Sequence, residues 1–164
     1  MMIKNTLTMI LTALAVLAVA AVALAETPSP LAMTNKTLGG GQLNAYTPGV
    51  EGGMGLNNIG LLVKTCGVVT YCDDTNKFFY INDGSGLKDG TQKLDGTDVI
   101  GVRVSYKDLA PNVSFTHPTQ GAWVTITGIS STSEISVDNA TRIVPTLMPR
   151  KQADVLESSV GGLP

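Results

Sequence analysis

The stretch that most constrains the fold is residues 60–72, GLLVKTCGVVTYC. It is rich in β-branched and aromatic residues, which favour strands, and its isolated internal glycine, Gly67, predicts a bulge or a tight bend. The next four residues, DDTN, are typical of a turn, because Asp and Asn side chains hydrogen-bond locally and tolerate left-handed backbone. KFFYIN at 77–82 then returns as a second strand. Together these segments predict a β-hairpin in an all-β domain.

Three further strands are predicted downstream of this hairpin. A long Gly- and Asp-rich loop, 83–98, leads to DVIGVRVSY at 98–106, where apolar and polar residues alternate and Arg103 falls on the exposed face. AWVTITGIS at 122–130 shows the same alternation, and ATRIVPTLMP at 140–149 forms a closing strand. Five short strands predict a small closed barrel or a sandwich, because a single small sheet would leave exposed edges.

The connections between these strands carry their own constraints. Two prolines in residues 107–120 leave room for only a short or irregular helix, and the polar STSE at 131–134 is expected to end the fourth strand. Pro145 requires an edge position or a bulge in the closing strand. The C-terminal tail, 151–164, is expected to hold one short helical turn.

The run from about Leu61 to Val144 resembles the OB-fold, a five-stranded Greek-key barrel. The features that carry the resemblance are TCGVV in the first strand, FFYINDGSG, GVRV in the third strand and WVTITG in the fourth. The run is most similar to OB-type modules of secreted bacterial proteins, and it departs from the OB pattern at 107–120, where such barrels often place a helix. The resemblance implies a surface that binds oligonucleotides or oligosaccharides, on the outer face of the second and third strands.

Three consecutive aromatic residues within 77–82 raise the question of which rings face outward. Successive side chains of a strand point to opposite faces, so Phe79 and Ile81 face the interior in one register, and the reverse register is nearly as good. Outward rings could stack on bases or on sugar rings. Alternatively they are structural cover, buried beneath the Gly-rich segment that precedes the barrel. The candidate ligand-binding residues are Lys77, Phe78, Tyr80, Asn82 and Arg103.

The N-terminal 25 residues have the organisation of a secretory signal peptide. Lys4 provides a short basic start, an apolar run follows, and Ala23-Leu24-Ala25 is a small-x-small cleavage site. The apolar run is near the lower limit for a spanning helix, so an uncleaved N-terminal anchor is the alternative. We therefore expect an exported protein that is secreted, periplasmic or held at the cell surface.

Residues 26–58 form a lead-in segment between the signal peptide and the barrel. Seven glycines and three prolines in this segment predict an irregular linker, or a segment that lies across the barrel without regular structure. Tyr46, Met54 and Leu56 are the apolar side chains expected to attach it. The predicted organisation is a signal peptide (1–25), this lead-in (26–58), an OB-like barrel (59–150) and a tail (151–164).

The two cysteines, Cys66 and Cys72, fall in one predicted strand. At about 3.3 Å per residue their Cα atoms would lie roughly 20 Å apart, beyond the roughly 7 Å that a disulfide spans. We expect two small buried thiols, with a disulfide possible only if the strand breaks near Gly67.

Charge and motifs argue against several functions. Cleavage after Ala25 leaves a formal charge of −3, whereas proteins that bind nucleic acids nonspecifically present a basic surface. The 83–98 loop does not match the alternating oxygen ligands of a calcium loop, and His117 and Ser85 stand in no nucleophile motif. No phosphate loop, dinucleotide fingerprint or paired-cysteine zinc spacing is present, so no cofactor, metal or catalysis is expected.

These observations predict a noncatalytic module that binds an oligosaccharide, a single-stranded oligonucleotide or a protein partner. The alternative is a structural or assembly protein of the cell envelope without a small ligand. Membrane association is expected only through an uncleaved signal segment, and the sequence does not define an oligomeric state.

Overall fold

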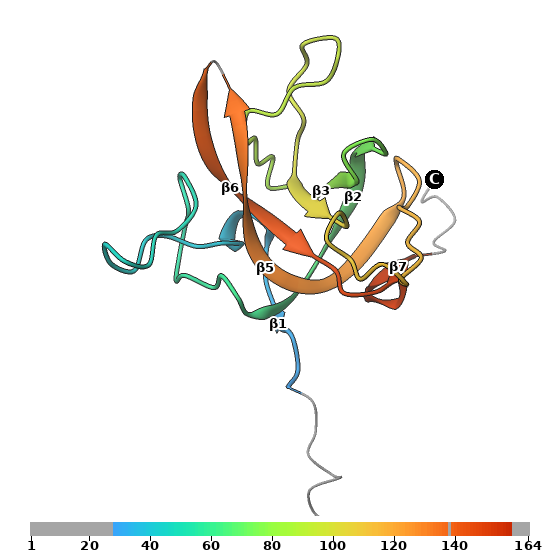
Figure 1. Cartoon of the computed structure of the whole chain (residues 1–164), viewed down its shortest axis with the longest axis horizontal. Helices are drawn as coiled ribbons and strands as arrows, with labels where there is room; N and C mark the ends of the chain where they lie inside the picture. The colour runs from blue at the N-terminus through green and yellow to red at the C-terminus, as the bar shows by residue number, and fades with distance from the viewer. Residues whose placement is uncertain (1–27, 138, 159–164) are drawn as a thin grey trace, which may run out of the picture.

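The computed structural model of the protein describes residues 28–137 and 139–158, so the predicted signal peptide lies outside the described residues. The described chain is all-β apart from two short 3-10 turns (Figure 1). The strands are β1 (Leu31–Ala32), β2 (Leu62–Asp73), β3 (Phe78–Asn82), β4 (Val102–Ser105), β5 (Trp123–Val137), β6 (Ala140–Met148) and β7 (Val155–Glu157), and the 3-10 turns are η1 (Asn35–Thr37) and η2 (Gln152–Asp154).

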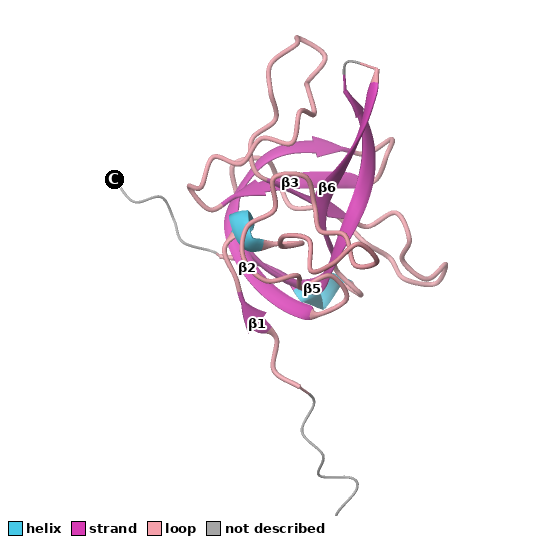
Figure 2. Ribbon diagram, turned by 90° about the vertical axis from the view of Figure 1, so that its left-hand side faces the viewer, coloured by secondary structure: helices cyan, strands magenta, loops and turns pink. Residues whose placement is uncertain are grey.

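Five of the strands form a closed ring, which confirms the expected all-β architecture (Figure 2). Going round the ring, β2 pairs with β3, β3 with β4, β4 with β6, β6 with β5, and β5 returns to β2. The β4–β6 pairing is parallel and the other four are antiparallel. Two short strands extend this ring: β1 pairs in parallel with β2, and β7 pairs antiparallel with β5.

Ring closure depends on β2, which changes partner along its length. Residues 62–68 pair with β5, and residues 68–73 pair with β3. Gly67 lies where the two pairings meet, and a Cβ atom there would be only 2.6 Å from the carbonyl carbon of Asn82. Glycine is therefore required at this position because the backbones of β2 and β3 approach too closely for any side chain.

The predicted bulge occurs in β2 but not at Gly67. The pairing with β5 runs without interruption through Gly67, and the register shift is in the pairing with β3, between Val69 and Tyr71. The extra residue is Thr70, whose hydroxyl donates to the carbonyl of Ile100 at 2.5 Å. The bulge brings Tyr71 opposite Tyr80, on the outer face of the barrel.

The barrel interior is filled by apolar side chains from every strand of the ring. Phe79 and Ile81 are fully buried in this core, so the first of the two registers considered for residues 77–82 is correct. The alternation predicted for the third and fourth strands is also confirmed. The buried core residues are Leu38, Val63, Val69, Phe79, Ile81, Val102, Val104, Val124, Ile126, Leu147 and Val155.

The fourth strand is longer than expected. β5 continues through residues 131–134, the STSE segment that was expected to end it, because it pairs with β6 along this whole stretch. The outer ends of the two strands, residues 132–137 and 140–145, project beyond the ring as a hairpin arm (Figure 1). Pro145 tolerates its strand position because the pairing of β6 with β4 begins only at Thr146.

The lead-in is attached to the barrel, but not by the apolar side chains predicted. Tyr46, Met54 and Leu56 are 96%, 57% and 85% exposed, so that prediction was wrong. Leu38 enters the barrel core instead, and Val50 is also buried. Hydrophobic character alone did not identify the attachment points.

Two buried asparagines fix the lead-in to the barrel. Asn35 donates from Nδ2 to the Ile81 carbonyl at 2.8 Å and accepts a hydrogen bond from Thr65 Oγ1 at 2.9 Å. Asn58 accepts a hydrogen bond from Ser130 Oγ at 2.6 Å and donates to the Thr37 carbonyl, also at 2.6 Å. These side chains satisfy buried polar groups of the barrel strands, so they specify where the segment lies.

The remaining expectations concern the cysteines and the tail. Cys66 and Cys72 are free thiols and are partly buried, as the spacing argument indicated. The helical turn expected in the tail is η2. The short strand β7 that follows it was not predicted, and it brings Val155 into the core.

We expect Gly67→Ala to lower the free energy of unfolding by about 1–3 kcal/mol, because a methyl group there overlaps the β3 backbone. Gly41→Ala is the matched control, since a Cβ at Gly41 meets its nearest atoms at 3.4 Å. Urea denaturation of both variants measures the difference. Equal stability of the two variants would contradict the role given to the glycine in ring closure.

Asn35→Ala is expected to cost about 1–3 kcal/mol, because it leaves the Ile81 carbonyl and the Thr65 hydroxyl without their buried partner. The exposed Asn112→Ala serves as the control. Amide hydrogen exchange in residues 28–58 should accelerate in Asn35→Ala alone. Unchanged exchange would mean that the lead-in is held by other contacts.

Candidate functional site

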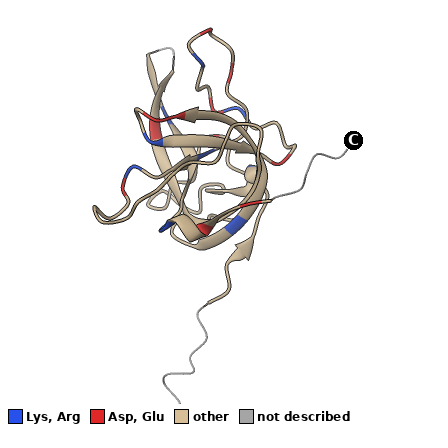
Figure 3. Ribbon diagram, turned by 90° about the vertical axis from the view of Figure 1, so that its right-hand side faces the viewer, with Lys and Arg blue, Asp and Glu red and all other residues tan. Residues whose placement is uncertain are grey.

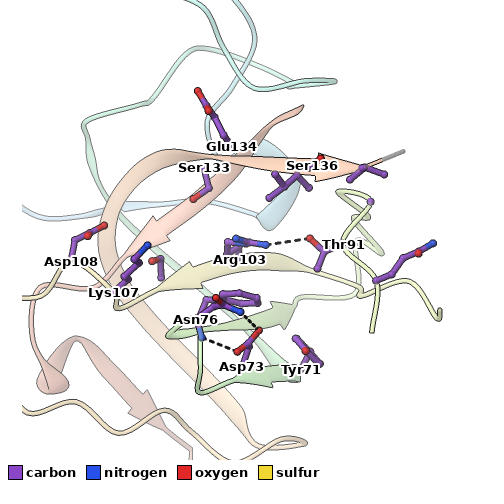
Figure 4. Close-up of a pocket in the computed structure, with 16 residues that line it drawn as sticks. Tyr71, Asp73, Asn76, Thr91, Arg103, Lys107, Asp108, Ser133, Glu134 and Ser136 are labelled. Atoms are coloured by element: carbon purple, nitrogen blue, oxygen red, sulfur yellow. Dashed lines mark hydrogen bonds between the residues drawn. The ribbon is translucent and has the colours of Figure 1, made fainter. Parts of the chain in front are cut away.

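A groove of about 740 Å³ lies on the outside of the barrel. Its floor is the outer face of β3 and β4, and its far wall is the hairpin arm, which contributes residues 133–137 (Figure 4). Residues 90–92 close one end, and Ser105, Lys107 and Asp108 line the other. Asn76, from the turn between β2 and β3, completes the rim.

Arg103 lies on the groove floor and is held by neutral groups. Its guanidinium carbon is 4.1 Å from the centre of the Phe78 ring, within the range of a cation–π contact. Nε donates to the hydroxyl of Tyr80 at 3.0 Å, and Nη2 donates to Thr91 Oγ1 at 3.3 Å (Figure 4). Two contacts from β3 and one from the loop that follows it therefore set both the position and the plane of the guanidinium.

The Tyr80 hydroxyl connects Arg103 to a buried carboxylate. It donates to Asp89 Oδ2 at 2.5 Å, and Thr91 Oγ1 lies 2.8 Å from the same hydroxyl. Burial, and then the charge of Asp89, raise the pKa of Tyr80. The hydroxyl therefore keeps its proton, donating to Asp89 while accepting from Arg103.

Phe78 and Tyr80 point to the outside of the barrel but are not open to solvent. Phe78 is 8% exposed and Tyr80 is fully buried, so of the two alternatives the rings fit structural cover and not open stacking faces. Together with Val99 and the partly buried Tyr71 they form an aromatic cluster, with ring centres 5.8–6.5 Å apart. The segment that covers them is the loop between β3 and β4, which supplies Asp89, Thr91 and Val99, and not the lead-in.

The five candidate residues fall into two groups. Phe78 and Arg103 line the groove, and Tyr80 supports them from beneath. Lys77 is exposed in the β2–β3 turn with φ +57°, and it lies outside the groove lining. Asn82 accepts hydrogen bonds from the amides of Gly84 and Gly86, so it shapes the turn after β3 and does not line the groove.

Several groove residues were missed by sequence reasoning. Tyr71 and Asp73 reach the outer face only because of the bulge at Thr70, which reverses the alternation of β2. Ser133 and Ser136 belong to the hairpin arm, in a stretch expected to lack a continuous strand. Alternation could not have marked both of them, because residues three apart in a strand point to opposite faces.

The groove carries charges of both signs. Arg103 and Lys107 line it together with three carboxylates, of Asp73, Asp108 and Glu134. Partial burial acts to raise the pKa of Asp73, but hydrogen bonds from residues 75–76 and the charge of Arg103 hold it below its usual value, so the group is ionised at neutral pH. Acidic and basic positions are likewise interspersed over the ribbon (Figure 3). No one sign of charge dominates the groove.

The potentially reactive side chains lie away from the groove. The Nε2 atom of His117 lies 2.8 Å from Asp74 Oδ1, and its Nδ1 atom lies 2.8 Å from the Pro118 carbonyl oxygen. His117 therefore links the segment 107–120 to the β2–β3 turn. Burial, followed by the nearby Asp74 charge, raises the pKa of the Cys72 thiol, which makes it less nucleophilic. Within the described ranges no three His, Cys, Asp or Glu side chains gather as a metal site, and no described helix is long and apolar enough to span a membrane.

No family model matches the chain, and no match to it was found among curated proteins or among solved structures.

Tyr80→Phe is expected to lower the free energy of unfolding by about 1–3 kcal/mol, because it leaves Oδ2 of the buried Asp89 and the Arg103 Nε–H without their hydrogen-bond partner. Tyr46→Phe removes the same hydroxyl from a ring that is 96% exposed and should have no effect. Urea unfolding of the two variants gives the comparison. If both variants match the parent protein, the hydroxyl network does not contribute to stability.

Proposed function

We propose that the protein is an exported, noncatalytic binding module with an OB-like barrel, and that the groove over β3, β4 and the hairpin arm binds an oligosaccharide. Numbered within the ring, the strands follow the order 1-2-3-5-4-1, with a parallel pairing between the third and the fifth. This order supports the Greek-key assignment suggested by the sequence. The organisation of residues 1–25 supports export.

The observation that carries the proposal is the position of the groove. OB barrels bind oligomeric ligands on the face of their second and third strands, between the loops that join strands one to two and four to five. The groove lies over β3 and β4, between Asn76 of the first of these turns and residues 133–137 beside the second. A ligand placed there would run across the strands, beneath the hairpin arm.

The lining of the groove favours a sugar chain over a nucleic acid. Six of its sixteen residues present uncharged hydroxyl or amide groups, and these groups suit ligands that present many hydroxyls. Three carboxylates oppose two cations, whereas a nucleic-acid site needs a positive groove to neutralise phosphates. The partly buried ring of Tyr71 is positioned to contact the face of one sugar. The uncharged polar groups are Asn76, Thr91, Gln92, Ser105, Ser133 and Ser136.

A second function, assembly with other envelope components, is favoured by a separate observation. The lead-in exposes Leu43, Tyr46, Met54 and Leu56, all of them more than half exposed. Exposed apolar side chains grouped on one segment are typical of surfaces that contact proteins. Size analysis of residues 26–164 distinguishes this function, because assembly would give a defined oligomer that Tyr46→Ser with Leu56→Ser converts to a monomer.

To test the proposed function, residues 26–164 are titrated against neutral and acidic oligosaccharides and, in parallel, a single-stranded oligonucleotide at about 50 and 200 mM salt. We expect binding to oligosaccharides and little binding to the oligonucleotide. Tyr71→Ala should weaken sugar binding about five- to tenfold, because one stacked ring is worth roughly 1 kcal/mol or more. Trp123→Ala, on an exposed ring outside the groove lining, is the control. Tight oligonucleotide binding that falls steeply with salt would contradict the proposal.

A further inference from the structure

Arg103 differs from the other arginines that the structure describes. Arg150 forms an ion pair with Asp154, through Nε–H and Nη2–H at 3.0 Å each, and Arg142 lies 4.0 Å from Glu51. No ion pair within the described residues involves Arg103, although this side chain is partly buried. A guanidinium removed from water usually has an anionic partner in direct contact, whereas Arg103 directly contacts only neutral groups: Asp73 acts on it at a distance and Asp89 is reached through the Tyr80 hydroxyl.

The contacts of Arg103 use only some of the N–H groups of its guanidinium. A guanidinium carries five N–H groups, and two are used here, one on Nε by Tyr80 and one on Nη2 by Thr91. Within the described chain no hydrogen bond engages Nη1, and Arg103 is one of the residues that line the groove. Since Phe78 and Tyr80 already fix the group, a ligand would bind it without a large cost in side-chain ordering.

We propose that Arg103 is the anchor for a single carboxylate of the ligand, and that the groove takes an oligosaccharide in which uronate residues stand among neutral sugars. The proposal rests on the function proposed above and names the ligand class of the same groove. A planar carboxylate matches the guanidinium fork and can accept two parallel N–H bonds. Lys107, two residues beyond the end of β4, also lines the groove and can approach the same ligand.

The acidic groups in the groove limit the charge that a ligand can carry. The carboxylates of Asp73, Asp108 and Glu134 line the same space as Arg103. A chain with an anion on every unit would bring some of its charges next to these carboxylates, where like charges repel. One isolated carboxylate could meet Arg103 while neutral hydroxyls contact Asn76, Ser133 and Ser136.

The test uses a xylo-oligosaccharide that bears one glucuronate, together with the same chain after reduction of the carboxylate to a hydroxymethyl group. Calorimetric titration of residues 26–164 should show binding of the acidic chain that is about 10- to 100-fold tighter than binding of the reduced chain. Tetragalacturonate, which is charged on every unit, should bind more weakly than the singly charged chain. A singly sulfated version of the same oligosaccharide tests whether the anchor requires a carboxylate.

Two variants separate the role of Arg103 from that of the groove. Arg103→Gln should abolish the preference for the acidic chain, and Arg103→Lys should lose most of it, because lysine keeps the charge but not the fork. Lys64→Gln removes one positive charge from an exposed position on β2 outside the groove lining and should leave the preference intact. Thermal unfolding of each variant establishes that the barrel is folded.

The outcomes distinguish the two proposals. Equal binding of the acidic and reduced chains, or a preference that survives in folded Arg103→Gln, overturns the role of Arg103 and leaves the oligosaccharide function standing. Tighter binding of the sulfated chain overturns the choice of carboxylate. If neither the acidic nor the reduced chain binds, and the wider oligosaccharide set also fails, then the proposed function itself is overturned.

Discussion

The structure depends on the close approach of β2 and β3 at Gly67. A five-stranded ring closes only if one long strand leaves one neighbour and joins another, and β2 does so within a few residues. β5 behaves in the same way on the opposite side, where it passes from β2 to β6 near Gly128, and a Cβ at Gly128 would lie 2.7 Å from the Met148 carbonyl oxygen. The absence of a side chain at Gly67 and at Gly128 thus determines the paths of β2 and β5.

The groove is a consequence of this closure together with one buried polar network. Closure places the outer face of β3 and β4 beneath the hairpin arm, and the loop after β3 then folds back over the aromatic cluster. Asp89 and Thr91 of that loop engage Tyr80, and Tyr80 in turn positions Arg103. The Tyr80 hydroxyl both donates and accepts within this buried network and so holds its partners in place, which sets the groove floor before any ligand arrives.

Local patterns in the sequence were sufficient to predict most of the strands. Alternation located β4 and the first half of β5, and turn residues located the β2–β3 hairpin, because both signals act over a few residues. The bulge at Thr70 could not be predicted, because a β-branched residue there fits an unbroken strand equally well. The burial of Tyr80 was also beyond local reasoning, since it depends on a loop whose Asp89 carboxylate returns to the ring hydroxyl.

Candidate site residues were predicted with mixed success, because alternation is a local signal whereas the path of the turns around a strand is not. Arg103 was identified because alternation determines the face of a short strand. Lys77 was included on proximity along the chain and Asn82 on the alternation of its strand, but the turns at both ends of β3 direct them away from the groove lining. The attachment of the lead-in by Asn35 and Asn58 was not predicted, because nothing in a Gly-rich segment marks which amide will be buried.

The two asparagines also determine where the chain can change in length. Asn35 and Asn58 hold the ends of the lead-in, and between them Leu43 and Tyr46 lie at an exposed tip around the Asn44–Thr47 bridge. Lengthening a closed loop costs only about 0.6 kcal/mol for each doubling. Insertions at this tip should therefore be nearly free of thermodynamic cost, whereas a deletion that shortens the span between the asparagines would pull one of them out of the barrel wall.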